Sequence, residues 1–373
     1  MKLYEYQAKD VFAKAGIPVP RSARIETASE AAAAVETIGL PCMVKAQVLH
    51  GGRGKAGLIR SAETAGEAAS LAEEILAKIP SGGGLLIEES VPLEKEMYLS
   101  VTLDPASARV LLMASASGGV DIETLAEERP EAIARVAVHP NVGLMPFHVR
   151  NLAAGLGLDK EAGKAFGRIA KQLFTLFRSS DATLAEINPL ALTADGSLVA
   201  ADAKLIIDDN AAYRQPFERA AESYADDVER EAADLGIPLL RFDGDIGLMC
   251  AGAGLTNTIF DLIHDFGGKP ANFLEFGGPN YRRAKEAMTL ALKCRPKVLL
   301  IVTFGTIARA DVMAEGVVEA MNELKPNCPI VTAIRGTNEE DASRTLRDAG
   351  LDPLSDTEEA VQRAIALAGG GNS

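Results

Sequence analysis

The second half of the chain repeats one pattern of hydrophobic and polar positions four times. A short apolar run leads to a glycine-containing turn, and a longer stretch with helical spacing follows each turn. The apolar runs span residues 246–251, 271–276, 298–304 and 329–334. Repeated strand–turn–helix units predict an α/β domain with a parallel, doubly wound sheet. The four turns would lie together at the carboxyl edge of this sheet, where such folds bind ligands.

The first half of the chain has a different character, and an acidic helical stretch at 218–235 ends it. A chain of 373 residues is long enough for two domains. We therefore predict one domain over residues 1–235 and a second over residues 236–373.

Residues 43–48 form an apolar run that contains one lysine, Lys45, and a glycine-rich loop at 51–57 follows it. A lysine on a buried strand is costly unless it meets an anion. A glycine-rich loop lets backbone N–H groups approach a phosphate, and Arg53 adds positive charge. The spacing is not that of a P-loop, and a plain turn is the commoner explanation of a glycine loop by itself.

Two short apolar runs, 183–185 and 197–201, flank a turn at Gly196 and predict an antiparallel hairpin. Asn188 and Asp202 would then lie side by side. An amide oxygen and a carboxylate suit Mg²⁺, which prefers few protein ligands and completes its octahedron with water and phosphate oxygens. An ordinary hairpin with polar ends is the alternative.

Two further strand-like segments, 85–89 and 94–99, carry acidic residues. Glu88 and Glu96 could accept hydrogen bonds from an adenine amino group or a ribose hydroxyl. Taken singly, solvated charges at a sheet edge are the simpler interpretation.

Composition excludes several classes of protein. An apolar fraction of 47% and a charged fraction of 24% are typical of a globular protein. The net charge of −14 argues against nucleic acid and anionic membrane surfaces as partners. No apolar run approaches the ~18 residues that a membrane span needs, and no signal peptide is visible. The four cysteines lack Cys-x-x-Cys spacing, which favours reduced thiols in a cytoplasmic protein.

The order of lysine strand, glycine loop, acidic strand and Asn/Asp hairpin resembles the ATP-grasp nucleotide-binding fold. Over nearly its whole length the chain is similar to the β subunit of the succinate–CoA ligase (succinyl-CoA synthetase) family. The matching segments are 3–9, 51–57, 113–115, 118–123, 214–216 and 270–274. The resemblance implies an N-terminal ATP-grasp domain and a C-terminal flavodoxin-like domain.

The family resemblance also implies an activity. ATP, a small carboxylic acid and CoA would react to acyl-CoA, ADP and phosphate through a phosphohistidine. That histidine would lie on a separate α subunit, which would also hold most of the CoA site. None of the chain's own histidines matches a phosphohistidine loop; they are His50, His139, His148 and His264. We therefore expect one subunit of a cytoplasmic hetero-oligomer, of the kind that serves the tricarboxylic acid cycle.

The resemblance assigns site residues by position. ATP contacts fall on Lys45, Gly52, Arg53, Gly54, Glu88, Val91 and Glu96. Mg²⁺ would bind Asn188 and Asp202, and Glu186 would hydrogen-bond the phosphohistidine. Pro20 stands where GTP-using members tend to carry glutamine, which favours ATP.

The acid-binding end departs from the family pattern. Its candidate residues are Ala251, Thr306, Ile307, Ala308, Arg309 and Arg335. Succinate enzymes carry an asparagine at position 251 and an acid at position 335. These changes favour another anionic acid, such as malate or sulfoacetate, with its distal charge held by Arg335 or Arg309. Drift of the loops, with a salt bridge from Arg335 to Glu339 or Glu340, is the rival interpretation.

Two other functional classes fit the fold less well. A non-catalytic regulatory partner would be expected to lose Lys45, Asn188 and Asp202, which are all present. A single-chain ATP-grasp ligase that forms an amide would not explain the C-terminal half.

Overall fold

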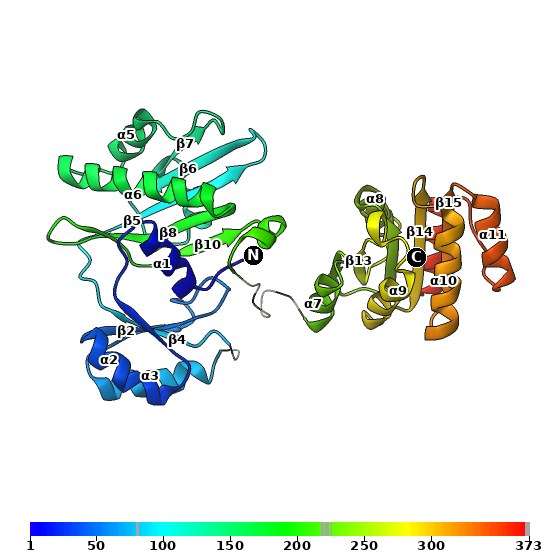
Figure 1. The fold of residues 1–373 in the computed structure, drawn as a ribbon, viewed down its shortest axis with the longest axis horizontal. Coiled ribbons are helices and arrows are strands. Elements are labelled where there is room, and N and C mark those ends of the chain that lie inside the picture. The colour runs from blue at the N-terminus through cyan, green and yellow to red at the C-terminus, as the bar shows by residue number, and fades with distance from the viewer. Residues whose placement is uncertain (80–81, 218–219, 221–223, 225, 370–373) are drawn as a thin grey trace. The chain divides into compact units, whose positions relative to one another are not determined.

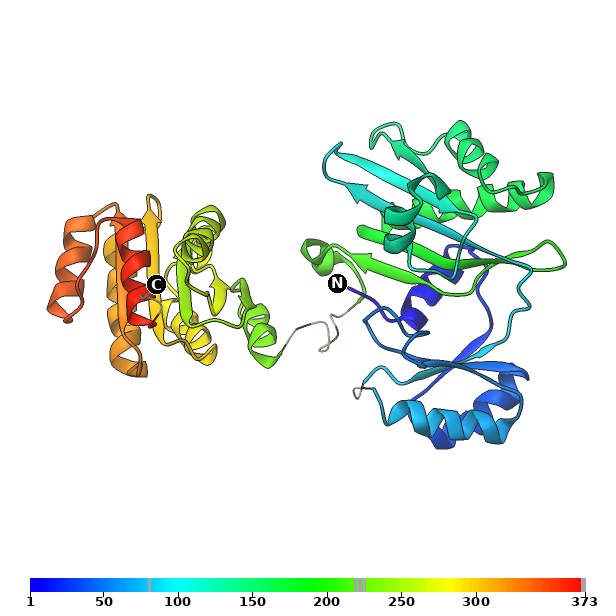
Figure 2. The ribbon, with the colours of Figure 1, turned by 180° about the vertical axis from the view of Figure 1, so that it is seen from behind.

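The computed structural model describes residues 1–79, 82–217, 220, 224 and 226–369. The chain divides into two compact units, Met1–Ser223 and Tyr224–Ser373 (Figures 1 and 2). The expected boundary at residue 235 falls at the end of helix α7 (Asp227–Asp234), within the second unit. Of the acidic stretch before α7, residues 218–219, 221–223 and 225 lie outside the described residues.

The first unit contains an antiparallel sheet of four strands in the order β1-β4-β2-β3. The strands are β1 (Ser22–Ile25), β2 (Cys42–Ala46), β3 (Ile59–Ala62) and β4 (Leu85–Glu89). Helices α2 (Ala31–Ile38) and α3 (Ala65–Leu76) cover one face (Figure 1). Helix α3 begins where the Thr64 hydroxyl accepts a hydrogen bond from the Glu67 N–H at 3.1 Å, satisfying a donor of the first turn.

A second, six-stranded sheet completes the first unit, in the order β10-β8-β5-β6-β7 with β9 paired to β8. The strands are β5 (Lys95–Asp104), β6 (Arg109–Ser115), β7 (Ile133–Val138), β8 (Ala182–Leu192), β9 (Leu198–Ala200) and β10 (Lys204–Ile207). The helices are α1 (Glu5–Lys14), α4 (Ile122–Glu128), α5 (Pro146–Ala154) and α6 (Lys160–Ser179). Helix α6 buries a stripe at three- and four-residue spacing, including Phe166, Leu173 and Phe177, which is the pattern of an amphipathic helix on a sheet.

The second unit is the predicted parallel, doubly wound domain. Its strands are β11 (Leu239–Arg241), β12 (Ile246–Ala251), β13 (Asn272–Leu274), β14 (Val298–Gly305) and β15 (Ile330–Gly336). Its helices after α7 are α8 (Ala253–Asp265), α9 (Ala284–Lys293), α10 (Ala310–Leu324), α11 (Glu339–Asp348) and α12 (Thr357–Leu367). Strands β12, β14 and β15 pair in parallel, and one apolar core lies on each face of their sheet.

The second of the four repeated strands differs from expectation. Strand β13 pairs antiparallel with β11, and isolated parallel bridges from Pro270 and Glu275, on either side of β13, join this segment to β12. The reason is a buried side chain: the Leu248 N–H donates to Asn272 Oδ1 at 3.1 Å, and Asn272 Nδ2 donates to the Leu248 carbonyl at 2.8 Å. One amide side chain therefore replaces a backbone pair, as buried polar groups require partners.

Short 3₁₀ segments occupy Ala28–Glu30, Pro130–Ala132, Asp209–Arg214 and Gly278–Asn280. None of the described helices combines the length and the apolar composition that crossing a membrane demands.

Candidate functional site

The hairpin of β8 with β9 and β10 places polar side chains in register. Glu186 pairs with Lys204, and Leu190 pairs with Ala200. The same register across the intervening residues puts Asn188 opposite Asp202. Because alternate residues of a strand share a face, Glu186 and Asn188 form a row beside Asp202 and Lys204.

Six buried or half-buried charges meet beside this hairpin. They are Lys9, Lys45 and Arg53 with Glu5, Glu88 and Asp202. We call this set the ion cluster. It joins the first helix, strands β2 and β4, the glycine loop and the Asn/Asp hairpin.

Lys45 and Arg53 are the centre of the ion cluster. Lys45 Nζ donates to Glu88 Oε1 at 2.6 Å, to Glu5 Oε1 at 3.2 Å and to the Ala201 carbonyl at 2.8 Å. Arg53 donates through Nη1 to Glu5 and through Nη2 to Asp202 Oδ2, the latter at 2.7 Å. The sequence-predicted phosphate-binding cations therefore lie together, against the predicted metal ligand.

The charges in the cluster are mutually compensated. Burial acts to lower the pKa of Lys45, but Glu5, Glu88 and Asp202 raise this pKa above its usual value. Burial would likewise raise the pKa of Glu5, yet Lys9, Lys45 and Arg53 hold it well below its ordinary range. Lys45 and Glu5 therefore stay ionised near neutral pH, because each meets opposite charges.

Glu88 is not a solvated edge charge, and that interpretation is wrong. Its side chain is 2% exposed, and its two oxygens accept from Lys45 and Lys9. Burial of a carboxylate requires such partners.

Glu96 and Asn188 meet at a loop after β6. The Gly119 N–H donates to Asn188 Oδ1 at 2.7 Å, and Asn188 Nδ2 donates to the Val120 carbonyl at 2.9 Å. A Cβ at Gly119, whose φ is +69°, would lie 2.3 Å from Glu96 Oε2. Only glycine allows this approach. Val91 lies half-buried between β4 and β5.

Glu186 is held by Tyr98, whose hydroxyl donates to Glu186 Oε2 at 3.1 Å. Burial raises the pKa of Glu186, and Lys204 and Tyr98 act in the opposite direction. Burial and the neighbouring Glu186 also raise the pKa of Tyr98, so its phenol keeps its proton and remains a donor.

Glu5, Lys9 and Tyr98 were not among the predicted site residues. A signal for the first two exists in the sequence. Glu5 and Lys9 share the helical stripe of Ala8 and Phe12, and all four are buried. Charged residues on the apolar stripe of a helix indicate a buried polar site.

The candidate acid-binding loops adjoin one another in the second unit. A Cβ at Gly277 would lie 2.9 Å from the Ala251 Cα, and one at Gly336 would lie 1.9 Å from the Gly305 carbonyl oxygen. The Thr337 N–H donates to the Gly305 carbonyl at 2.8 Å. The glycines therefore let the loops after β12, β14 and β15 stay close to their neighbours.

In the loop 306–309, Thr306, Ile307 and Arg309 are exposed and Ala308 is half-buried; Ile307 is 95% accessible. Arg309 Nε donates to Asp311 Oδ1 at 3.0 Å. Arg335 Nε donates to Glu339 Oε1 at 3.0 Å, and Arg335 Nη1 donates to the Ser355 carbonyl at 2.7 Å. The salt bridge of the rival interpretation is therefore present.

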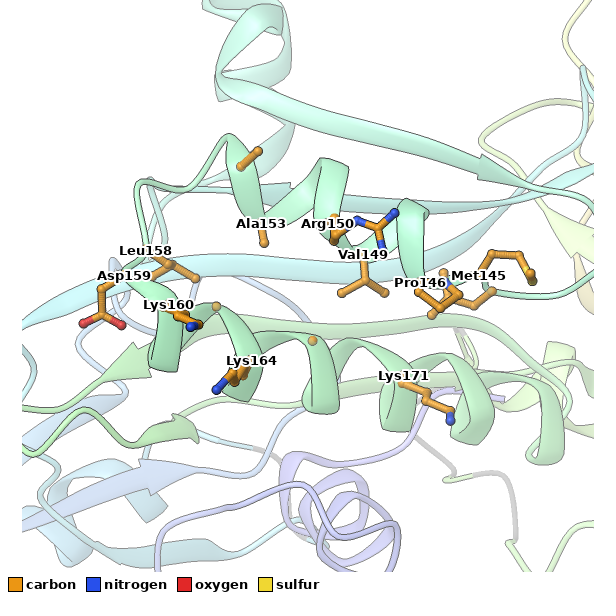
Figure 3. Close-up of a pocket in the computed structure, with 14 residues that line it drawn as sticks. Met145, Pro146, Val149, Arg150, Ala153, Leu158, Asp159, Lys160, Lys164 and Lys171 are labelled. Atoms are coloured by element: carbon orange, nitrogen blue, oxygen red, sulfur yellow. The ribbon is translucent and has the colours of Figure 1, made fainter.

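A separate groove of about 690 Å³ lies between α5 and α6 (Figure 3). Val149, Ala153 and Leu158 contribute apolar surface, and Lys160 and Lys171 also line it. None of the predicted site residues lines this groove. It is therefore distinct from the ion cluster.

Known proteins match the chain over its whole length. The family model described as ATP-grasp domain matches residues 2–192, and the one described as CoA-ligase matches residues 249–367. An ADP-forming sulfoacetate-CoA ligase subunit from Bilophila wadsworthia is 52% identical over 371 residues, covering 99% of this chain and 100% of the relative. One from Acholeplasma sp. is 51% identical, covering 99% and 92%.

More distant matches agree. The β subunit of an ADP-forming succinate–CoA ligase from Ignicoccus hospitalis is 42% identical, with 99% of both chains covered. ATP citrate lyase from Methanothrix soehngenii shares the fold, with a TM-score of 0.73, 21% identity and coverage of 98% and 99%. The chain therefore belongs to the β-subunit family of ADP-forming acid–CoA ligases, in which an ATP-grasp domain precedes a CoA-ligase domain.

Proposed function

We propose that this chain is the β-type subunit of an ADP-forming sulfoacetate–CoA ligase. The observation that carries the proposal is the higher whole-chain identity to two sulfoacetate-CoA ligase subunits, 52% and 51%, than to a succinate–CoA ligase subunit at 42%. The departures at the acid-binding loops support it independently, because they remove the asparagine and the acid of the succinate pattern. This acid does not imply the tricarboxylic acid cycle.

Arg335 and Arg309 suit a sulfonate chemically. A sulfonate stays ionised at neutral pH and offers several oxygens, which the planar fork of arginine matches. Arg335 uses Nε and Nη1 for hydrogen bonds to the protein, and its guanidinium lies over the Phe304 ring. Its Nη2 has no hydrogen-bond partner in the described part of the chain. The side chain is 37% exposed, so a substrate can reach it. Glu339 would orient the guanidinium rather than block it.

ATP is proposed to bind at the ion cluster and the loops beside it. The contacts would be Lys45, Gly52, Arg53, Gly54, Glu88, Val91 and Glu96. Glu88 would act by orienting Lys45, since both its oxygens already accept from lysines. A Cβ would meet nothing within 4 Å at Gly52 or Gly54, so a phosphate would meet no side chain of this loop at these two positions.

Asn188 and Asp202 are proposed to bind Mg²⁺. Their paired segments offer an amide oxygen, which also accepts from the Gly119 N–H, and a carboxylate oxygen. Two protein ligands fit a hard cation that takes its other ligands from water and phosphate. The bound ion would neutralise phosphate charge.

The reaction needs a partner. We propose an α subunit that carries the phosphohistidine and the CoA site. Its histidine would take the γ-phosphoryl group of ATP and pass it to the acid, and CoA thiolate would then attack the acyl carbon and expel phosphate. Glu186, oriented by Tyr98, would hydrogen-bond the phosphohistidine at the ATP site. The four free cysteines support a cytoplasmic location.

The test is an acid screen with the purified two-subunit complex, ATP, Mg²⁺ and CoA. Sulfoacetate, succinate, malate and acetate are compared by ADP release, for wild type, Arg335→Ala, Arg309→Ala and the distant control Arg363→Ala. We expect sulfoacetate to have the highest kcat/KM. Loss of a charge-assisted hydrogen bond costs about 1.5–3 kcal/mol, so Arg335→Ala or Arg309→Ala should lower it roughly 10- to 100-fold.

Ala251→Asn provides the reciprocal test, because it restores the asparagine of the succinate pattern. This variant should lower the ratio of kcat/KM for sulfoacetate to kcat/KM for succinate. If succinate is the best substrate and neither Arg335→Ala nor Arg309→Ala changes kcat/KM, the loop changes are drift. If no acid supports ADP release while ATP binds, the regulatory alternative is favoured.

A further inference from the structure

Helix α1 brings two charged side chains into the ion cluster, and neither has a role in the function proposed above. Glu5 is 2% exposed and Lys9 is 3% exposed. We propose that both are positioning residues for ATP: Glu5 orients Lys45 and Arg53 toward the phosphates, and Lys9 balances the third carboxylate of the cluster, so that no net negative charge repels them. This inference rests on the proposed assignment of Lys45 and Arg53 to ATP.

Glu5 connects all three cations of the cluster. Its Oε1 accepts from Lys9 at 2.7 Å and from Lys45 at 3.2 Å, and its Oε2 accepts from Arg53. Lys45 lies on strand β2 and Arg53 lies on the glycine loop. The Glu5 carboxylate therefore fixes the position of these two cations relative to each other. Without Glu5, Arg53 would keep only Asp202 and the Ala46 carbonyl as partners.

Lys9 decides the net charge of the cluster. Three cations face the deeply buried Glu5 and Glu88 and the more exposed Asp202, whose side chain is 30% exposed. In the structure the six charges balance. Without Lys9 the cluster carries a net charge of −1, which opposes the approach of phosphate.

A contribution to stability alone does not explain why Glu5 and Lys9 are buried together. Removing two charges from water is costly, and well-packed apolar residues often replace a buried ion pair without loss of stability. The i,i+4 spacing of Glu5 and Lys9 is common on helix surfaces, where it contributes little. Here both side chains are buried and share Glu88, Lys45 and Ala201 with the nucleotide site, which indicates a role in that site.

The experiment measures phosphorylation of the partner histidine by ATP in the purified complex, which requires no acid. Lys9→Met should raise the Kd of MgATP about tenfold, with kcat little changed. Glu5→Gln leaves the cluster with a net charge of +1, so ATP should bind no more weakly, while kcat falls roughly 10- to 100-fold because the cations are misplaced. Asp10→Asn and Lys14→Met, exposed on the same helix, are the matched controls.

The double variant Glu5→Gln with Lys9→Met keeps the cluster balanced and tests positioning if Glu5→Gln alone does not fold. It should bind ATP like wild type and transfer phosphate slowly. If Lys9→Met lowers only thermal stability, or if the two single variants change Kd and kcat in parallel, the proposal is refuted. Lys45→Met tests the proposed ATP site itself. If this variant binds ATP normally, the assignment of ATP to the ion cluster is wrong, whichever acid the enzyme activates.

Discussion

Replacing Asp202 by asparagine separates metal binding from folding. In the structure Asp202 Oδ2 accepts from Arg53 at 2.7 Å, and Oδ1 accepts from the Ala203 N–H at 2.7 Å. Asparagine can keep the second bond but turns an NH₂ group toward a guanidinium. Because Asp202 is 30% exposed, losing this pair should cost only about 1–2 kcal/mol of stability. Losing the charge that is proposed to hold Mg²⁺ should raise the barrier to phosphoryl transfer by about 3–4 kcal/mol.

The measurement follows from these two magnitudes. A barrier increase of about 3–4 kcal/mol slows phosphorylation of the proposed partner histidine roughly 10²- to 10³-fold, whereas the stability loss leaves the protein folded at 25 °C. Labelled phosphate from γ-labelled ATP is followed in the complex over a range of Mg²⁺ concentrations, with thermal unfolding measured alongside. Asp195→Asn, in the turn of the same hairpin, is the control. Near-normal phosphorylation at saturating Mg²⁺ would show that Asp202 does not hold the metal.

Three further predictions concern other parts of the molecule. Asn272→Ala leaves the Leu248 N–H and carbonyl without their partner, which should destabilise the second unit by about 2–5 kcal/mol in denaturant unfolding. Hydrogen bonds from Arg214 and Gln215 lower the pKa of Asp181 to about 2, below its model-compound value of 3.8. The ionised Asp181 therefore stabilises the fold above the pKa of the unfolded chain, and this stabilisation is lost as the pH falls through the pKa of the folded state. The Tm deficit of Asp181→Asn should accordingly vanish toward about pH 2. The isolated chain should bind ATP yet incorporate no acid-labile phosphate from γ-labelled ATP.

A specific result would contradict each of these three predictions. A loss below about 1 kcal/mol for Asn272→Ala would mean that water or a shifted strand satisfies Leu248. A Tm deficit of Asp181→Asn that is constant with pH would show that charge at Asp181 is not the cause. Stable phosphohistidine on the chain alone would remove the need for a partner histidine.

Several elements could be predicted from the sequence because their causes are local. The alternation of apolar runs, glycine turns and helical stretches defined the parallel second unit. The turn at Gly196 and the strands beside it set the register that places Asn188 opposite Asp202. Turn geometry and side-chain alternation act over a few residues, so short patterns suffice. The family resemblance was confirmed by the comparisons.

What only the tertiary structure decided is how distant charges meet. In the sequence the positions of Glu5 and Lys9 on an apolar helix stripe signal burial but not their partners, and Glu88 is an acidic residue near a strand end. Their burial depends on β2, β4 and the hairpin packing around them, which brings Glu5 and Asp202 onto the same Arg53. Likewise, β13 leaves the regular ladder because one side chain, Asn272, reaches across to β12. Such pairings join residues far apart in the chain, and local propensity carries no information about them.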